Sequence, residues 1–223
     1  MPSAHPTLLL ASASPARLST LRSAGVEPLV RVSAVDEDSS VADAQAAHGP
    51  LAPADVALLL ARAKAEDVVS TLEEAEEERE GGVLVLGCDS VLELDGEMHG
   101  KPADADEATQ RWQRMRGRSG ILHTGHWLVD LRAPEDGGTS GMLGGTASTT
   151  VHFADLEDAE IEAYVATGEP LRVAGAFTLD GLGAPYVSGI EGDPSNVVGV
   201  SLPLLRDLVG ELGVLWHDLT TPC

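Results

Sequence analysis

The chain has little cysteine and no long apolar run. Of its two cysteines, Cys88 lies in an apolar stretch and Cys223 is the last residue. This spacing fits neither a metal site nor the disulfide framework of a small secreted protein. The first apolar run, residues 8–11, is far too short for a signal peptide or a membrane span. We therefore expect a cytoplasmic protein with no membrane partner.

Positive charge is also scarce. The chain has 14 basic and 36 acidic residues, which gives a formal net charge of -22. This balance argues against binding to a nucleic acid polymer, which needs basic patches. An anionic substrate would have to be held by locally placed cations, helix N-termini or a metal, because the overall field repels it.

Several familiar active-site motifs are absent. The glycines form no dinucleotide-binding fingerprint and no Walker-type phosphate loop. There is no Gly-x-Ser-x-Gly nucleophile elbow. The seven histidines show no zinc-site spacing, and we expect His123 and His126 to be structural or rim residues. Any site must therefore be built from other residues.

The apolar pattern predicts an α/β fold with a mixed sheet, formed by one domain over residues 1–223. Short apolar runs at residues 7–11, 29–35 and 83–86 predict strands. Asp95-Gly96 predicts a two-residue hairpin turn. A long helix is expected from Pro53, with the acidic run 73–78 as its solvated end. The remaining patterns predict helices over residues 105–115, 157–167 and 201–212, and paired strands over residues 121–131 and 146–153.

The turn after the first strand is the first candidate site. Ser14 can cap a helix and Pro15 suits its first turn. Unpaired N–H groups at such a helix start attract phosphate, and the hydroxyls of Ser12 and Ser14 and the guanidinium of Arg17 add donors. The alternative is a plain helix cap with a surface arginine.

The second candidate is Asp89, in Gly87-Cys88-Asp89-Ser90. An acid placed just after a buried strand lies at the carboxyl edge of the sheet, where ligands bind in α/β folds. Its carboxylate could hold Mg²⁺ or orient a water molecule. The alternative is a solvated turn aspartate.

The two lysines, Lys64 and Lys101, form the third candidate. All other basic residues are arginine, so ordinary surface positions do not require lysine. A compact ammonium group is often used at phosphate sites. Lys64 lies beside the apolar stripe of the long helix, and Lys101 precedes Pro102 in a stiffened loop. The alternative is that two lysines escaped a compositional bias.

The motifs, taken in order, resemble those of the Maf family, whose fold is inosine triphosphatase-like. The resemblance covers nearly the whole chain. It rests on Leu10-Ala11-Ser12-Ala13-Ser14-Pro15 with Arg17, Ala61-Arg62-Ala63-Lys64-Ala65, Leu86-Gly87-Cys88-Asp89-Ser90-Val91, Asp95-Gly96, Gly100-Lys101-Pro102, Gly117-Arg118, His123-Thr124-Gly125, Tyr164, Thr167-Gly168-Glu169-Pro170, Ala174-Gly175-Ala176-Phe177, Gly181-Leu182-Gly183 and Asn196-Val197-Val198-Gly199.

The resemblance implies an elongated mixed sheet flanked by helices, with a cleft between two lobes. It implies a nucleoside triphosphate pyrophosphatase that removes modified or surplus nucleotides. A divalent cation is implied, usually Mg²⁺ with Mn²⁺ as the alternative, as are frequent homodimers. Carried over by position, the catalytic residues are Asp89, Lys64 and Lys101, the metal ligands are Glu37 and Asp89, and the substrate-binding residues are Ser12, Ser14, Arg17, Ser90 and Asp180.

Some positions depart from the family pattern. Ala16 stands where many members have arginine or tryptophan, and Asp180 where many have glutamine or glutamate. Val173 replaces a frequent basic residue, with Arg172 one step earlier, and the segment 198–203 carries extra residues. The first two positions lie near the base in the family, so the preferred base stays open. Two other functions remain: a nucleotide-binding regulator of cell division with little turnover, and a phosphatase that makes nucleoside diphosphate and orthophosphate.

Overall fold

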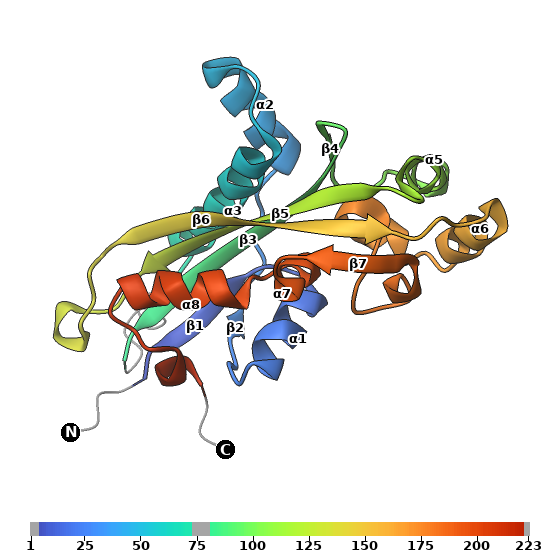
Figure 1. Ribbon diagram of the computed structural model, residues 1–223. Helices are drawn as coiled ribbons and strands as arrows, with labels where there is room; N and C mark the ends of the chain where they lie inside the picture. The colour runs from blue at the N-terminus through green and yellow to red at the C-terminus, as the bar shows by residue number, and fades with distance from the viewer. Residues whose placement is uncertain (1–4, 73–80, 221–223) are drawn as a thin grey trace.

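A mixed sheet forms the middle layer of the molecule. The computed structural model describes residues 5–72 and 81–220 (Figure 1). Its strands have the order β2-β1-β3-β5-β6-β7, with β4 beside β3. β1 runs parallel to both neighbours, whereas the remaining pairs are antiparallel. The strands are β1 (Thr7–Ala11), β2 (Leu29–Val30), β3 (Val83–Leu94), β4 (Glu97–His99), β5 (Ser119–Asp130), β6 (Met142–Phe153) and β7 (Val187–Glu191).

Helices cover both faces of the sheet. α3 lies on one face with α2 projecting beyond it, α1, α7 and α8 lie on the other, and α5 and α6 stand at the far end (Figure 1). No helix in the described ranges is long and apolar enough to cross a membrane. The helices are α1 (Pro15–Ser23), α2 (Glu37–His48), α3 (Pro53–Ser70), α5 (Ala105–Met115), α6 (Asp158–Ala166), α7 (Pro194–Val198) and α8 (Leu202–Glu211), with 3₁₀ turns η1 (Pro134–Asp136), η2 (Pro170–Arg172), η3 (Ala174–Ala176), η4 (Ala184–Tyr186) and η5 (Trp216–Leu219).

Alternating side chains divide the core between these layers. In β3, Leu84 and Leu86 pack in a cluster with α1 and α8, whereas Val83 and Val85 pack in a cluster with α3. A third cluster around Trp112 joins α5 and α6 to the distal half of the sheet. Successive residues of a strand face opposite sides, so the alternation fixes which face each polar residue of β3 reaches.

Much of the expected pattern is confirmed. The first strand and the helix over residues 105–115 have the expected bounds. The expected helices beginning at Pro15 and Pro53 are also present, and Leu94 pairs with Glu97 across the expected Asp95-Gly96 turn. The acidic run at residues 73–78 lies outside the described residues.

β3 is longer than the expected strand over residues 83–86. It continues through Asp89 to Leu94, because β5 pairs with it antiparallel from Leu84 to Glu93. Gly87, which suggested the end of the strand, is instead a point of close approach. A Cβ atom there would lie 2.1 Å from the carbonyl oxygen of Ala61 in α3. Asp89 is therefore a strand residue and not a turn residue.

Two other strands also differ from expectation. The strand over residues 29–35 is reduced to β2, because β2 pairs with β1 and β1 ends one residue beyond the pairing of Leu10 with Val30. β6 begins at Met142, ahead of the expected strand over residues 146–153, and so takes in Gly144 and Gly145. Gly144 leaves room for the Trp127 ring, since a Cβ there would meet it at 2.2 Å.

α2, α7 and β7 were not expected. α2 buries none of its residues, so it has no apolar stripe for a periodicity argument to find. The start of α2 does have a sequence signal, since Asp36 is a residue type favoured at a helix N-cap. In the structure, its carboxylate accepts a hydrogen bond from the Ser39 N–H. This helix brings Glu37 to the sheet.

His126 should make folding stability depend on pH. Its Nδ1 lies 3.0 Å from the Thr124 carbonyl oxygen, and its Nε2 accepts the Ser201 N–H at 2.8 Å, which requires a neutral ring. Burial lowers the pKa of His126 to about 4, although the Thr124 carbonyl opposes the shift. The unfolded chain therefore takes up this proton first as the pH falls below about 6.5.

We expect the free energy of unfolding to fall by about 2 kcal/mol between about pH 7 and about pH 4.5, because the unfolded chain binds a proton at His126 that the folded chain does not. Denaturant unfolding of the parent and of His126→Gln at both values tests this. The variant is less stable at neutral pH, and the difference between the two proteins should shrink at acidic pH. A constant difference would show that folding does not lower the pKa of His126.

Candidate active site

A gap in the sheet creates the main cleft. β1 pairs with β3 only as far as Gly87, and β4 begins to pair at Leu92. Residues 88–91 of β3 therefore have no strand neighbour on that side within the described chain. A cavity of about 1170 Å³ opens at this gap, lined by the turn after β1, by α2, α3 and β3, and by the segment 172–182.

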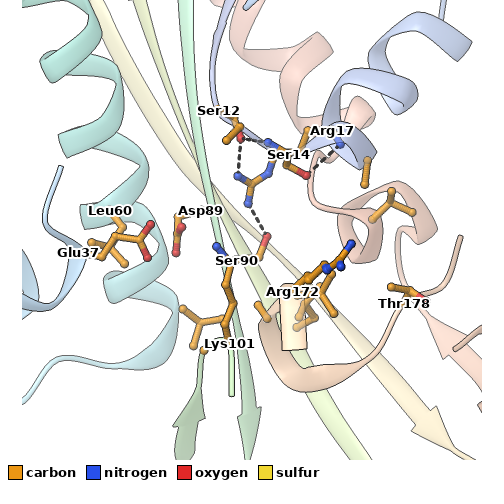
Figure 2. A pocket seen from close by; sticks show the side chains of 18 of the residues that line it. Ser12, Ser14, Arg17, Glu37, Leu60, Asp89, Ser90, Lys101, Arg172 and Thr178 are labelled. Atoms are coloured by element: carbon orange, nitrogen blue, oxygen red, sulfur yellow. Dashed lines mark hydrogen bonds between the residues drawn. The ribbon is translucent and has the colours of Figure 1, made fainter. Parts of the chain in front are cut away.

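Neighbouring residues of β3 reach opposite walls of the cleft. Asp89 shares the α3 face with Val85 and contacts Lys64, whereas Ser90 faces α1 and contacts Arg17. Figure 2 shows both side chains at the gap. Because successive side chains of a strand face opposite sides, the adjacent residues Asp89 and Ser90 place a carboxylate on one wall of the cleft and a hydroxyl on the other.

Arg17 is a buried cation without a carboxylate partner in the described ranges. Its residue is 9% exposed, and its Nε donates to Gly199 O at 2.8 Å. Its two terminal nitrogens donate to Ser12 Oγ at 3.0 Å and to Ser90 Oγ at 3.1 Å (Figure 2). All three acceptors are neutral, and two of the five N–H groups of a guanidinium remain for another acceptor. Because a buried charge is costly unless it is paired, an anion in the cleft would complete this environment.

Lys64 joins two carboxylates. Its Nζ lies 2.5 Å from Asp89 Oδ1 and 2.7 Å from Glu37 Oε1. The Lys64 and Asp89 side chains are largely buried, whereas that of Glu37 is 46% exposed. One carboxylate from β3 and one from the first turn of α2 thus converge at the cleft.

The two carboxyls differ in their acidity. Burial raises the pKa of Asp89 above its ordinary value, although the charges of Lys64 and Arg17 oppose the shift. Burial also acts on Glu37, but the hydrogen bond and charge of Lys64 outweigh it and lower the pKa of Glu37. Asp89 is therefore the carboxyl that more readily accepts a proton.

Two further cations line the cleft, Lys101 and Arg172, and neither forms an ion pair with a described carboxylate. Lys101 is exposed and follows Gly100, whose carbonyl oxygen accepts hydrogen bonds from Arg111 at 2.5 Å and from the Gly175 N–H at 3.1 Å. These bonds fix the backbone beside Lys101. In the sequence, Arg172 is notable only because it directly precedes Val173, a position where the family frequently has a basic residue.

The remaining predicted positions lie around the same cleft. Ser14 caps α1 by accepting the Arg17 N–H, so the plain-cap interpretation describes its hydroxyl in this structure. Asp180 is exposed on the wall formed by residues 177–182. Cys88, beside Asp89, is fully buried, and burial raises its thiol pKa to about 12, so the thiol stays protonated. The predicted residues therefore come together, while their roles stay predictions.

Comparisons with known proteins point to one family. The model of the Maf-like protein family matches residues 7–212. A relative from Leifsonia xyli subsp. xyli is 53% identical over 95% of both chains. One from Salinispora tropica is 56% identical over 96% of this chain and 89% of its own, and one from Streptomyces avermitilis is 54% identical over 96% and 95%. All three relatives are named nucleoside triphosphate pyrophosphatase.

Proposed function

We propose that this chain, which belongs to the Maf-like protein family, hydrolyses nucleoside triphosphates to nucleoside monophosphate and pyrophosphate. The names of relatives that match it over almost their full length support this reaction. We further propose that residues 1–223 form one domain of this kind, acting in the cytoplasm. Its role would be to remove modified or surplus nucleotides.

The observation that carries the proposal is the set of cations in the cleft that form no ion pair with a described carboxylate. In a chain with a net charge of -22, Arg17, Lys101 and Arg172 all line one cavity and form no ion pair with a described carboxylate. Such a group of cations suits a polyphosphate. The overall field would otherwise repel that ligand.

Glu37 and Asp89 suit a divalent cation. Both carboxylates already converge on one cation, Lys64, and Asp89 is buried with its pKa raised, so additional positive charge would stabilise its ionised form. Mg²⁺ is commonly held by one or two carboxylates together with substrate phosphates. When bound, such an ion would neutralise phosphate charge.

The proposed chemistry assigns a separate task to each side chain. Asp89 would orient a water molecule and accept its proton as the water oxygen bonds to the α-phosphorus. The bond between the α-phosphorus and the bridging oxygen breaks, and pyrophosphate leaves with the electron pair. Arg17, Lys64 and Lys101 would stabilise the charge that develops on the phosphates.

A substrate panel tests this function. The purified protein would be given canonical and modified nucleoside triphosphates with Mg²⁺ or Mn²⁺, and pyrophosphate and orthophosphate would be measured separately. We expect pyrophosphate and monophosphate in equal amounts. Tight nucleotide binding without release of either phosphate product would favour the nucleotide-binding regulator. Formation of orthophosphate and nucleoside diphosphate would favour the phosphatase.

Asp180→Gln should change the ranking of nucleotides more than the best rate. An ionised aspartate only accepts hydrogen bonds, so it favours a base edge that presents donors, such as a guanine N–H edge or a cytosine amino group. Glutamine offers both donors and acceptors, and matched polar contacts can change discrimination by orders of magnitude. kcat/KM across the panel measures the effect, with exposed Asp207→Gln on α8 as the control. A uniform loss of rate with an unchanged ranking would show that Asp180 does not read the base.

A further inference from the structure

The Glu169 carboxylate collects four hydrogen bonds from the cleft wall and its support. Oε1 accepts from Tyr164 Oη at 2.9 Å, from Thr178 Oγ1 at 2.5 Å and from the Gly183 N–H at 3.0 Å. Oε2 accepts from the Leu182 N–H at 3.0 Å. Glu169 also lines the main cleft, but a carboxylate has about four acceptor sites, and these four donors occupy most of that capacity.

The segment 178–183, which we call the wall loop, lies directly on this carboxylate. A Cβ atom on Gly181 would lie 2.6 Å from Glu169 Oε2, and one on Gly183 would lie 2.4 Å from Tyr164 Oη. Just before the loop, the Trp112 indole N–H donates to the Ala176 carbonyl oxygen at 2.8 Å, and the Trp112 ring packs edge-on against Tyr164. The loop is therefore held by a fixed support beneath it and by an anchor at its start.

The wall loop has open space on two sides. Residues 178–182 line the main cleft, with Thr178 visible on its wall in Figure 2. Leu179 and Asp180 also line a second cavity of about 410 Å³ between the loop, α1 and α7. Asp180, at the tip of the loop, is exposed. The hydrogen bonds to Glu169 are the main described contacts that fix where Asp180 stands.

We propose that Glu169 is a positioning residue for base selection: it holds the wall loop, and with it Asp180, at a fixed place in the cleft without touching the substrate. This inference rests on the proposed nucleotide function and deepens it. Its consequence is specific. Loosening the loop should affect the part of the ligand beside it and leave the polyphosphate contacts of Arg17 and Lys101 unchanged.

The ionised state of Glu169 supports this role. Burial acts to raise its pKa, but hydrogen bonds from Thr178, Leu182, Tyr164 and Gly183 outweigh burial and hold the pKa below its ordinary value. Glu169→Gln keeps the shape but turns one oxygen into an NH₂ group. At least one loop donor would then face another donor.

The test compares selectivity with polyphosphate affinity. For the parent, Glu169→Gln and Gly181→Ala, kcat and KM would be measured on four nucleoside triphosphates that differ in base. The inhibition constant of inorganic triphosphate, which has no base, would be measured in parallel. Exposed Glu162→Gln on α6 is the matched control. We expect both Glu169→Gln and Gly181→Ala to reduce the spread of kcat/KM across bases by about tenfold, mainly through KM, with triphosphate inhibition unchanged.

Two results would overturn the inference: an unchanged spread, or a parallel loss for every nucleotide and for inorganic triphosphate, which would mark a general structural role. Calorimetric binding of the same nucleotides separates this inference from the reaction itself. If the parent binds them selectively but releases no pyrophosphate, the proposed function fails while the binding spread still tests Glu169. Tyr164→Phe removes one donor and serves if Glu169→Gln does not fold.

Discussion

Replacing Asp89 by asparagine is expected to lower kcat by ~100- to 10,000-fold, the range of general base catalysis, while nucleotide affinity stays within a few fold. The substitution keeps the size of the side chain and its place on β3 but removes the charge that pairs with Lys64. Arg17 and Lys101 would still bind the phosphates.

The control for this variant is Asp95→Asn, at the turn that follows the same strand. Asp95 is exposed, pairs with Arg118 and has a positive φ that asparagine also tolerates. Single-turnover rates and calorimetric affinity would be measured for both variants and the parent. Turnover by Asp89→Asn within a few fold of the parent would remove Asp89 from the mechanism.

Removal of divalent cations is expected to abolish turnover, with a fall of at least ~100-fold in excess chelator, since metal ions contribute several kcal/mol of charge stabilisation in such reactions. Glu37 and Asp89 bring two carboxylates towards a substrate that is itself a polyanion. Without additional positive charge, these groups repel the phosphates.

The chelator experiment needs two controls. Excess Mg²⁺ should restore the rate, and the melting temperature of the protein should be the same with and without chelator. Glu37→Gln should raise the Mg²⁺ concentration needed for half-maximal activity. Full turnover in excess chelator would contradict the metal role of both carboxylates.

Most residues of the cleft could be predicted from the sequence, because local patterns of residue types indicate them. The sequence indicates Asp89 as an acid that follows an apolar run, and it indicates Lys64 and Lys101 because the chain otherwise uses arginine. The expectation that Asp89 follows the end of its strand is wrong, because β3 continues to Leu94. Asp89 nevertheless lies at an edge of the sheet, because the parallel neighbour β1 stops opposite Gly87. The sequence of one strand does not show where its pairing with a neighbouring strand ends, especially when the strand stays paired on its other side.

Other features depend on contacts between distant segments. Glu37 had no signal of its own apart from the resemblance, because α2 buries none of its residues. The sequence carries no motif that points to Arg172, yet this residue lines the cleft without an ion pair in the described chain. The hydrogen bonds of Arg17 to Ser90 and Gly199 join residues separated by 73 and 182 positions. That Arg17 forms no ion pair with a described carboxylate follows from the positions of these distant segments, which the sequence alone does not give.

The position of bond cleavage is the central claim, and hydrolysis in H₂¹⁸O tests it most directly. A nucleoside triphosphate would be turned over to completion, and the products analysed by ³¹P NMR and mass spectrometry. Attack of water on the α-phosphorus predicts one ¹⁸O atom in the monophosphate and an unlabelled pyrophosphate. Label in pyrophosphate, or nucleoside diphosphate with labelled orthophosphate, would contradict the account.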